Sequence, residues 1–390
     1  MSGGDKADGE NKRKNAKNQK KLKKIPGQEV VLGDVLGEGA YGQVREGLRV
    51  KEGPKFGQRV AVKIISRKLL RKARNGQQNL KREINCLKKL KHSNIIQLYD
   101  VIDLDELDKI YLVLELANYK SLQDIMDDHR SKHPDAEGSG LSEEQYRNLF
   151  HQLVLGLREC HNKGVVHRDI KPANLQLTSE GVLKIIDFGV AESLDHFSQL
   201  DDTEKFAGTP AYQPPEVANG CRSFKALKVD VWAAGVTLYV MATGRVPFPG
   251  ETIEELYANI GKGEYKIPPE VQKKESLCEV VTGLVEPDPD KRLALEDVLD
   301  HAWLKEGDVT KRFKNLAGQG EAEGDRKGQT LLDRYLDQDS SDEGSDGDND
   351  SGSPTDDARG ETISKVLSGG QQQPQQQSWL GMIKNTFGVA

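Results

Sequence analysis

The feature that most constrains the fold is one change of hydrophobic pattern between residues 28 and 304. Over the first part the apolar runs are short and strand-like, as in VVLGDVL, QRVAVKIIS and IYLVLEL, with one helical pattern at Leu80–Leu90. Beyond it the periodicity becomes mainly helical. The pattern predicts an α+β body with a small β-rich lobe at residues 28–117 and a larger helical lobe at 118–304. A functional site is expected in the cleft between the two lobes.

Charged or low-complexity segments flank this body. Residues 1–27 form a basic head with a KKLKK cluster, and residues 305–377 hold a run of acids followed by a run of glutamines. We expect both to be disordered, because neither can bury enough apolar surface to offset its chain entropy. Residues 378–390 carry apolar side chains at helical spacing and are predicted to form a short amphipathic segment that docks on the body or on a partner.

Composition excludes several classes of protein. Hydrophobic residues make up 36% of the 390, too many for a chain that is disordered throughout. The longest apolar stretch, residues 231–242, is shorter than the roughly 18 residues of a membrane span, and the basic start is unlike a secretory signal. The four cysteines form no CxxC pair, which predicts free thiols in a reducing compartment. We therefore expect a protein without a membrane span, in the cytoplasm, the nucleus or both.

A glycine-rich run, GEGAYGQV, lies between two strand patterns at residues 37–44. Glycine lets backbone amides approach a phosphate closely. The same spacing occurs in dinucleotide-binding folds, but there a helix follows, whereas here a strand pattern does. Lys63, near the end of the next strand, is placed to meet the α- and β-phosphates of a nucleotide. Glu83, on the predicted helix, is placed to pair with Lys63 and hold it extended.

The strongest motif is HRDIKPANL, followed at a distance by a DFG triplet. Asp169 has the position of the base that accepts a hydroxyl proton, and Lys171 can steady the transferring phosphoryl group. Asn174 and Asp187 are the predicted metal ligands, because Mg²⁺ prefers oxygen ligands and takes others from water and phosphate. Phosphoryl transfer requires mainly positioning and charge neutralisation, which these groups supply. The motif therefore predicts ATP and Mg²⁺ as cofactors, with Mn²⁺ as a substitute metal.

The order of these motifs, closed by PPE at residues 214–216, resembles the eukaryotic protein kinase family over about 270 residues. The resemblance implies the bilobal protein kinase fold. It also implies that Leu114 is the gatekeeper of an adenine pocket, where the base meets the Glu115 carbonyl and the Ala117 amide. The residues expected to bind the nucleotide are Gly37, Glu38, Gly39, Ala40, Tyr41, Gly42, Val44, Ala61, Lys63, Glu83, Leu114, Glu115, Ala117, Gln176 and Asp187.

One position departs from the family pattern. Gln176 stands where the family usually places an apolar residue beneath the adenine ring. Its methylenes can lie there, but an amide buried without a partner costs about 1–3 kcal/mol, so ATP binding is expected to survive in weakened form. The resemblance gives other motif residues structural roles. Glu216 is expected to pair with Arg292 inside the large lobe, and Asp230 is expected to be structural as well.

The segment after the DFG triplet lacks the usual activating residue. In the family, Arg168 usually grips a phosphate on this segment. Lys205 stands where many kinases have an activating threonine, and the offset of Thr203 is poor. Asp201 and Asp202 can present carboxylates to Arg168 instead. The sequence therefore predicts activation by a partner, or constitutive activity, rather than activation by loop phosphorylation.

Lys171 in HRDIKPAN and Thr209 in GTPAY are typical of serine/threonine kinases, which predicts a serine or threonine acceptor. Longer stretches, including DFGVAESLDHF, AYQPPEVANG and ELYANIGKGEYKIP, resemble the liver kinase B family of master kinases. This resemblance implies that the substrates are activation-loop threonines of AMP-activated protein kinase and its relatives. It also implies two activating partners, a pseudokinase adaptor and a helical-repeat scaffold.

Three other functions are open to a chain of this kind. A pseudokinase scaffold would have the fold without turnover, but such proteins typically lose one of the lysine and aspartate motifs that this chain keeps. A calcium/calmodulin-dependent kinase kinase would need a basic amphipathic helix after the catalytic region, and residues 305–316 match that pattern only weakly. Nucleic-acid binding is not favoured by the sequence, since it depends on the basic head, which has no aromatic residue for base stacking.

Overall fold

The computed structural model describes residues 22–51, 54–194, 200–201, 208–307 and 331. The chain divides into two units, residues 1–337 and 338–390. The second unit lies outside the described residues, as do most of the basic head and the acidic and glutamine-rich tail. The structure therefore does not test the predictions for the undescribed parts of these segments. It does describe residues 22–27 of the head and residue 331 of the tail, and Leu331 is only 5% exposed in an apolar cluster, so the expectation of disorder is wrong at this residue. The following description concerns the first unit.

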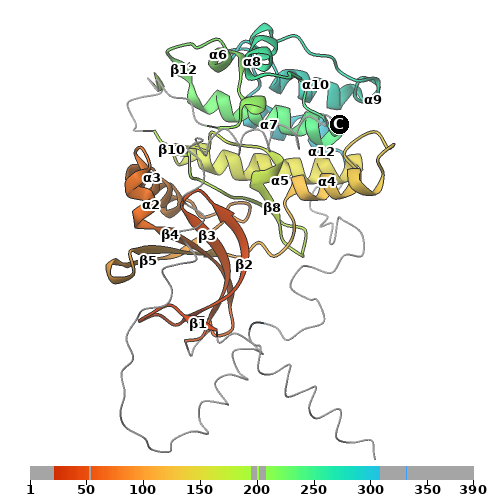
Figure 1. The fold of residues 1–390 in the computed structure, drawn as a ribbon. Helices are drawn as coiled ribbons and strands as arrows, with labels where there is room; N and C mark the ends of the chain where they lie inside the picture. Colours follow the sequence, from red (N-terminus) through yellow and green to blue (C-terminus); the bar gives the residue numbers. More distant parts are fainter. Residues whose placement is uncertain (1–21, 52–53, 195–199, 202–207, 308–330, 332–390) are drawn as a thin grey trace, which may run out of the picture. The chain divides into compact units, whose positions relative to one another are not determined.

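The small lobe is a six-stranded sheet with the strand order β1-β2-β3-β4-β6-β5, in which every neighbouring pair is antiparallel. Two helices lie between the fourth and fifth strands in the chain (Figure 1). A short 3₁₀ turn, η1, joins the last two strands. The elements are β1 (Lys23–Lys24), β2 (Val30–Gly39), β3 (Gly42–Arg49), β4 (Arg59–Ser66), α2 (Arg67–Lys72), α3 (Gly76–Lys89), β5 (Leu98–Leu104), η1 (Asp105–Leu107) and β6 (Lys109–Glu115).

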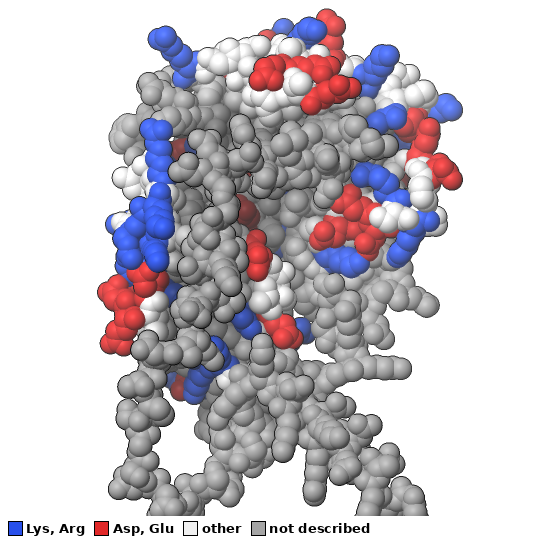
Figure 2. Space-filling model, viewed as in Figure 1, with Lys and Arg blue, Asp and Glu red and all other residues white. Residues whose placement is uncertain are grey.

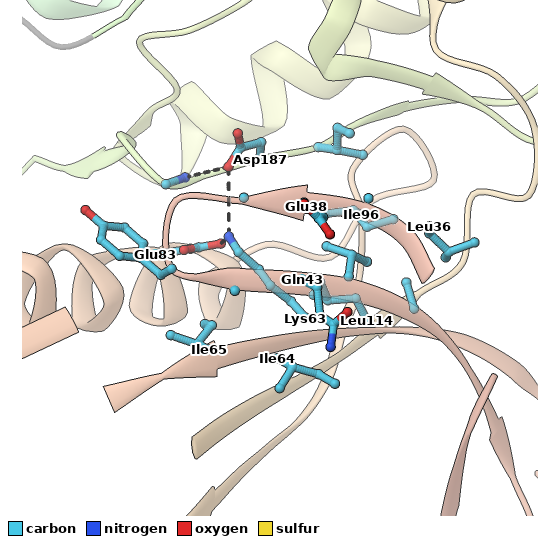
Figure 3. Close-up of a pocket in the computed structure, with 18 of the residues that line it drawn as sticks. Leu36, Glu38, Gln43, Lys63, Ile64, Ile65, Glu83, Ile96, Leu114 and Asp187 are labelled. Carbon is cyan, nitrogen blue, oxygen red and sulfur yellow. Dashed lines mark hydrogen bonds and ion pairs between the residues drawn. The ribbon is translucent and has the colours of Figure 1, made fainter. Parts of the chain in front are cut away.

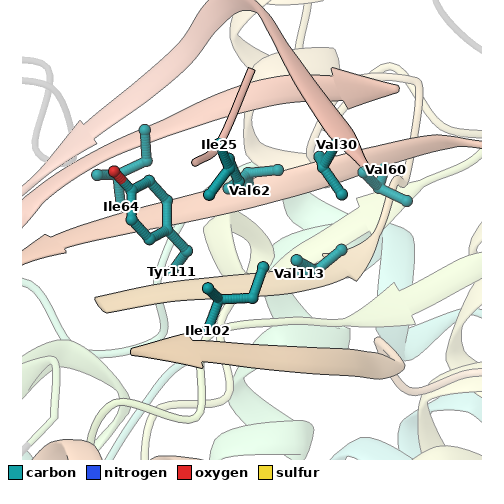
Figure 4. Packing of buried hydrophobic residues seen from close by; sticks show 8 residues of the cluster. All are labelled: Ile25, Val30, Val60, Val62, Ile64, Ile102, Tyr111 and Val113. Atoms are coloured by element: carbon teal, nitrogen blue, oxygen red, sulfur yellow. The ribbon is translucent and has the colours of Figure 1, made fainter. Parts of the chain in front are cut away.

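The sheet has an apolar face because its central strand alternates. Residues 60, 62 and 64 of β4 point to one side, where they pack with apolar residues of β2, β5 and β6 (Figure 4). The intervening residues, Ala61 and Lys63, face the opposite side. The cluster consists of Ile25, Val30, Val60, Val62, Ile64, Ile102, Tyr111 and Val113. Burial of this face fixes the register of β4, and the register in turn points Lys63 toward the other lobe.

The ordered body begins earlier than the sequence predicts. Residues 22–27 fall within the head for which disorder is expected, yet Lys23 and Lys24 pair with β2 as the edge strand β1. Ile25 is only 1% exposed and belongs to the apolar cluster of the sheet. The basic pattern hides this strand, because lysines are well suited to an exposed sheet edge while a single isoleucine provides the anchor.

The large lobe is mainly helical. It also contains three short two-stranded sheets, which pair segments of the loops between its helices. Two of its helices begin with reciprocal capping boxes, at Ser121 and Ser142, which fix where α4 and α5 start. The helices are α4 (Leu122–Lys132), α5 (Glu143–Asn162), α6 (Pro215–Ala218), α7 (Ala226–Thr243), α8 (Ile253–Lys262), α9 (Pro269–Gln272), α10 (Glu275–Leu284), α11 (Leu295–Asp300) and α12 (Ala302–Lys305). The paired strands are β7 (Val165–Val166) with β10 (Glu192–Ser193), β8 (Leu175–Leu177) with β9 (Leu183–Ile185), and β11 (Leu200–Asp201) with β12 (Phe224–Lys225).

Helix α7 is the centre of this lobe. It contacts both α5 and α10, and its residues are buried around its whole circumference. Gly235 permits the close approach of α10, because a Cβ at this position would lie 2.6 Å from Leu284 Cβ. In the described part of the chain, α7 is the one helix long and apolar enough to cross a membrane, but 83% of it is buried inside the lobe. Its apolar sequence is explained by this core position.

Candidate active site

A cavity of about 1150 Å³, large enough for a nucleotide, opens between the sheet of the small lobe and the first loops of the large lobe (Figure 3). Every residue predicted to bind the nucleotide lines it. They come from the β2–β3 hairpin, from β4, α3 and the end of β6, and from the β8–β9 region. The structure therefore brings together residues that are up to 150 positions apart in the sequence.

The glycine-rich run forms the tight end of the β2–β3 hairpin. Gly39 pairs with Gly42 across the turn. Gly42 has a φ of +157°, and a Cβ there would lie 1.9 Å from the carbonyl oxygen of Ile64. Only glycine lets β3 pack so closely against β4 at this point. At Gly37 an added Cβ would meet no atom within 4 Å, so the backbone stays open toward the cavity.

The predicted pairing of Lys63 with Glu83 is present. Lys63 Nζ lies 2.6 Å from Glu83 Oε1 and 4.0 Å from Asp187 Oδ1, so the ammonium group bridges helix α3 and the DFG triplet (Figure 3). Burial favours the neutral amine, but the carboxylates of Glu83 and Asp187 outweigh it and raise the pKa of Lys63. Lys63 is thus a fixed positive charge inside the cavity.

The second half of the site lies in the large lobe, outside the set of residues that line the cavity. Asp169 Oδ1 accepts bonds from the Thr209 amide at 2.9 Å and from the Thr209 hydroxyl at 2.7 Å. Lys171 Nζ lies 2.8 Å from Asp169 Oδ2 and donates to Thr209 Oγ1 at 2.5 Å. Burial favours the protonated acid, but Lys171 and Thr209 outweigh it and lower the pKa of Asp169.

The two predicted metal ligands lie at the junction of these halves. Asn174 donates through Nδ2 to the Asp169 carbonyl at 2.8 Å and to Asp169 Oδ2 at 2.9 Å, so both bonds use the amide nitrogen. The Asn174 carbonyl also accepts from the Ile186 amide at 3.0 Å, next to Asp187. The side chain of Asp187 is 55% exposed and lines the cavity. One amide oxygen and one carboxylate beside a cavity large enough for a nucleotide fit the ligand preferences of Mg²⁺.

The expected penalty at Gln176 does not arise. Gln176 Nε2 donates to the backbone carbonyl of Tyr119, just beyond the stretch that joins the two lobes. The amide therefore has a partner, and the premise on which weakened ATP binding was expected is wrong. At the start of the same stretch, the Glu115 carboxylate lies 2.5 Å from Lys184 Nζ and so anchors the end of β6 to the large lobe.

The residues expected to have structural roles are engaged in the large lobe. Arg292 forms a two-pronged ion pair with Glu216, at 2.9 and 3.1 Å, and both side chains are buried. Asp230 is fully buried and accepts bonds from the backbone amides of His167 and Arg168 at 2.8 and 2.7 Å. The Asp230 bonds hold the HRD loop in place, and the Arg292–Glu216 pair joins α6 to the segment before α11, so both carboxylates have structural roles.

Sequence reasoning missed the partner of Arg168. The Arg168 guanidinium is paired with the Glu192 carboxylate, which lies on β10 immediately after the DFG region. Strand β10 pairs with β7, next to the HRD motif, and this pairing delivers Glu192 to Arg168. Residues 202–207, and with them the alternative candidates Asp202, Thr203 and Lys205, lie outside the described residues, as does the Asp201 side chain. No sequence motif identifies Glu192 as the partner of Arg168. The two residues are brought together by the β7–β10 pairing, which has only two residues in each strand and is too short to be predicted from a pattern.

Comparisons with known proteins agree with this geometry. The protein kinase domain family matches residues 30–304. The chain is 43% identical over 288 residues to serine/threonine-protein kinase stk11 of Xenopus laevis, a match that covers 74% of this chain and 63% of that protein. It is 42% identical over 276 residues to the human protein of the same name, covering 70% of this chain and 60% of the relative.

A more distant relative is the serine/threonine-protein kinase stk11 homolog of Dictyostelium discoideum, with 36% identity over 274 residues, or 70% of this chain and 44% of that protein. The matched region thus spans about three fifths of the length of the vertebrate relatives. The two-lobed fold predicted from the hydrophobic pattern is the fold of this family. The chain belongs to the protein kinase family, and its kinase domain is of the serine/threonine type, similar to that of the STK11 proteins.

Proposed function

We propose that the protein transfers the γ-phosphoryl group of ATP to serine or threonine residues of other proteins. The observation that carries this proposal is the pair of charge clusters on the two sides of the cleft. Lys63, held by Glu83, lines the cavity on the side of the small lobe. Asp169, held by Lys171 and Thr209, lies in the large lobe beyond the residues that line the cavity, where it accepts a bond from Asn174. A scaffold without turnover would have no use for both clusters.

The roles of the side chains follow from their charges. Lys63 neutralises the charge of the α- and β-phosphates, and the backbone amides of the hairpin around Gly37 approach the phosphates from the side of the small lobe. Asn174 and Asp187 would hold Mg²⁺, which would neutralise the charge of the phosphate oxygens. Asp169 has a lowered pKa and is a weak base. It therefore orients the acceptor hydroxyl and takes its proton only as the bond to phosphorus forms and the hydroxyl becomes acidic. Lys171, beside it, stabilises the phosphoryl oxygens.

For the substrate class, we propose activation-loop threonines of kinases of the AMP-activated protein kinase type. The similarity to the STK11 kinases through the whole catalytic domain supports this class. We also propose that a pseudokinase adaptor and a helical-repeat scaffold bind and activate the chain, in the cytoplasm or the nucleus. Support for activation without loop phosphorylation comes from Arg168, whose guanidinium is already paired with the carboxylate of Glu192.

A transfer assay tests the activity. Purified full-length chain is incubated with [γ-³²P]ATP, Mg²⁺ and an activation-loop peptide with a single threonine, with and without the adaptor and scaffold. We expect labelled phosphothreonine, greater with the partners present, and loss of at least about 100-fold of the rate in Asp169→Asn. Label confined to tyrosine in tyrosine-containing peptides would contradict the acceptor class. An Asp169→Asn variant as active as the parent would contradict the mechanism.

The activation mechanism needs a separate variant. Glu192→Gln keeps the shape of the side chain and removes the charge that faces Arg168. If Glu192 stands in for an activating phosphate, the variant loses activity with the partners present, while Thr203→Ala keeps it. The reverse result, loss of activity in Thr203→Ala alone, would show that loop phosphorylation is required.

A further inference from the structure

One residue from beyond the large lobe lies on the sheet of the small lobe. Leu331 follows the end of helix α12 by 26 positions in the sequence. Its side chain is only 5% exposed and packs with Val31, Leu48 and Val50. The catalytic machinery described above does not use it. A leucine so far along the chain from the rest of its cluster is buried here for a reason that the kinase motifs do not supply.

The face of the sheet on which Leu331 lies is the nucleotide face. Across β3 and β4, Val44 pairs with Lys63, Glu46 with Ala61 and Leu48 with Arg59. Cross-strand partners share a face, and alternate residues of a strand do too. Leu48, which belongs to the same cluster as Leu331, is therefore on the same side as Lys63. In agreement with this register, Leu331 itself lines the nucleotide cavity.

Gly33 leaves the space that Leu331 fills. A Cβ at Gly33 would lie 2.8 Å from Leu331 Cδ2 and 3.3 Å from Glu46 Cβ, so any larger residue would push the leucine away. The φ of Gly33 is not in the left-handed region, so the backbone alone does not demand glycine there. Glycine at position 33 therefore leaves space that the Leu331 side chain occupies.

Gly33 is also where β2 leaves its regular pairing. The register of β2 against β3 is continuous to Leu32 and then shifts twice before Gly37. At this irregular point Arg45 donates two bonds to the Gly33 carbonyl, at 2.9 and 2.6 Å. Leu331 covers the Cα of the same residue. The arginine and the leucine together fix the start of the segment that ends in the glycine-rich hairpin.

We infer that Leu331 is a positioning residue for the nucleotide site: it holds β2 at Gly33 on the nucleotide face and thereby places the glycine-rich hairpin over the phosphates. This inference rests on the proposed ATP-dependent activity. It assigns to Leu331, a residue beyond the kinase domain, an indirect role in nucleotide affinity. Leu331 does not touch the reacting atoms, so its effect is expected on binding of ATP more than on the rate of transfer.

Steady-state kinetics of the full-length chain test the role. Leu331→Ala is expected to raise the KM for ATP about fivefold while kcat changes by less than about twofold. Leu331→Met keeps the apolar volume and should behave as the parent. Leu227→Ala, at a leucine that is 37% exposed on the large lobe, is the matched control and should change neither constant. An unchanged KM in folded Leu331→Ala would overturn the inference.

A double-mutant cycle with Gly33 gives a readout that needs no catalysis. Gly33→Ala alone should displace Leu331 and lower the Tm, as Leu331→Ala should by about 3–5 °C. In the double variant the new methyl group occupies the vacated space, so the second change should add little. Additive effects would refute the contact. If the parent chain transferred no phosphate at all, the kinase proposal would fail, whereas this cycle would still decide whether Leu331 packs on Gly33.

Discussion

The Lys63–Glu83 pair of the small lobe and the Arg292–Glu216 pair of the large lobe differ in how many partners hold them. Arg292 is fully buried, forms two bonds to Glu216 and donates further bonds to the carbonyls of Glu286 and Lys228. Lys63 is 27% exposed, forms one short contact with Glu83 and approaches Asp187 at 4.0 Å. The lysine retains donor capacity and an opening to the cavity, whereas the arginine uses its donors within the lobe.

The difference shows how a functional charge can be distinguished from a structural one. A side chain whose hydrogen bonds are all made inside the protein can stabilise a fold but has little left for a ligand. The carboxylates near Lys63 favour its positively charged form. Its ammonium group forms one short contact, with Glu83, and can still bind a phosphate oxygen. The family resemblance already implies different roles for the two pairs, and the three-dimensional contacts give the physical basis of that difference.

The largest expected effect is on the structural pair. Arg292→Met leaves the Glu216 carboxylate buried without its partner, which should lower the free energy of unfolding by about 3–5 kcal/mol. Urea denaturation measures it. Lys291→Met, at the neighbouring position where the side chain is 76% exposed, is the control and should change stability little. Equal losses in the two variants would erase the distinction drawn between the pairs.

The functional pair should show the opposite profile. Lys63→Met is expected to lower kcat/KM by about 100-fold or more, because a positive charge facing the phosphates is removed. Its Tm should change much less than that of Arg292→Met, since the lysine is part-exposed. Lys81→Met, at an exposed position on the same helix as Glu83, serves as the control for loss of a charge. A large fall in Tm without loss of activity would reverse the assignment.

The free energy of unfolding at acid pH should depend on the ionisation of Asp169. Its pKa is lowered by Lys171 and Thr209 against the effect of burial, so its ionised form stabilises the fold. That contribution is complete above the ordinary aspartate pKa of about 4 and is lost as the pH falls through the lowered value. The stability difference between the parent and Asp169→Asn should therefore be constant from pH 8 to about pH 5 and shrink below about pH 4. Denaturation at several pH values measures it, and a difference that changes between neutral pH and pH 6 would contradict the assigned cause.

The smallest expected effect is at Gln176. Gln176→Leu removes the donor to the Tyr119 carbonyl while keeping an apolar surface in the cavity. Because the glutamine amide is already satisfied, we expect the Kd for ATP to change by less than about twofold and the Tm to fall slightly. Isothermal titration with ATP and Mg²⁺ measures the affinity. A several-fold lower Kd for ATP in the variant would show that the Gln176 amide weakens nucleotide binding.

The lobes and the motif-bearing part of the site were predictable from the sequence for a physical reason. Alternation along β4 sets its two faces, and the same alternation points Lys63 to the cleft. The contacts that the sequence did not predict depend on the paths of loops, which bring together residues that no sequence pattern links. Glu192 reaches Arg168 through the β7–β10 pairing, and Gln176 reaches Tyr119 through the path of the chain after β6. Leu331 begins the run LLDRYL, whose apolar residues have helical spacing, but nothing in this short run within a polar tail indicates the contact with Gly33 that the structure shows.

The burial of Ile25 has a practical consequence for anyone who wishes to produce a shorter version of the protein. A recombinant fragment with the limits of the family match, residues 30–304, would lack Ile25 and Leu331. Each of these residues covers one face of the β2 strand, on opposite sides of the sheet. Such a fragment would expose apolar surface to solvent on both faces of the sheet near the start of β2. Cloning boundaries at residues 22 and 337 keep both covers in place.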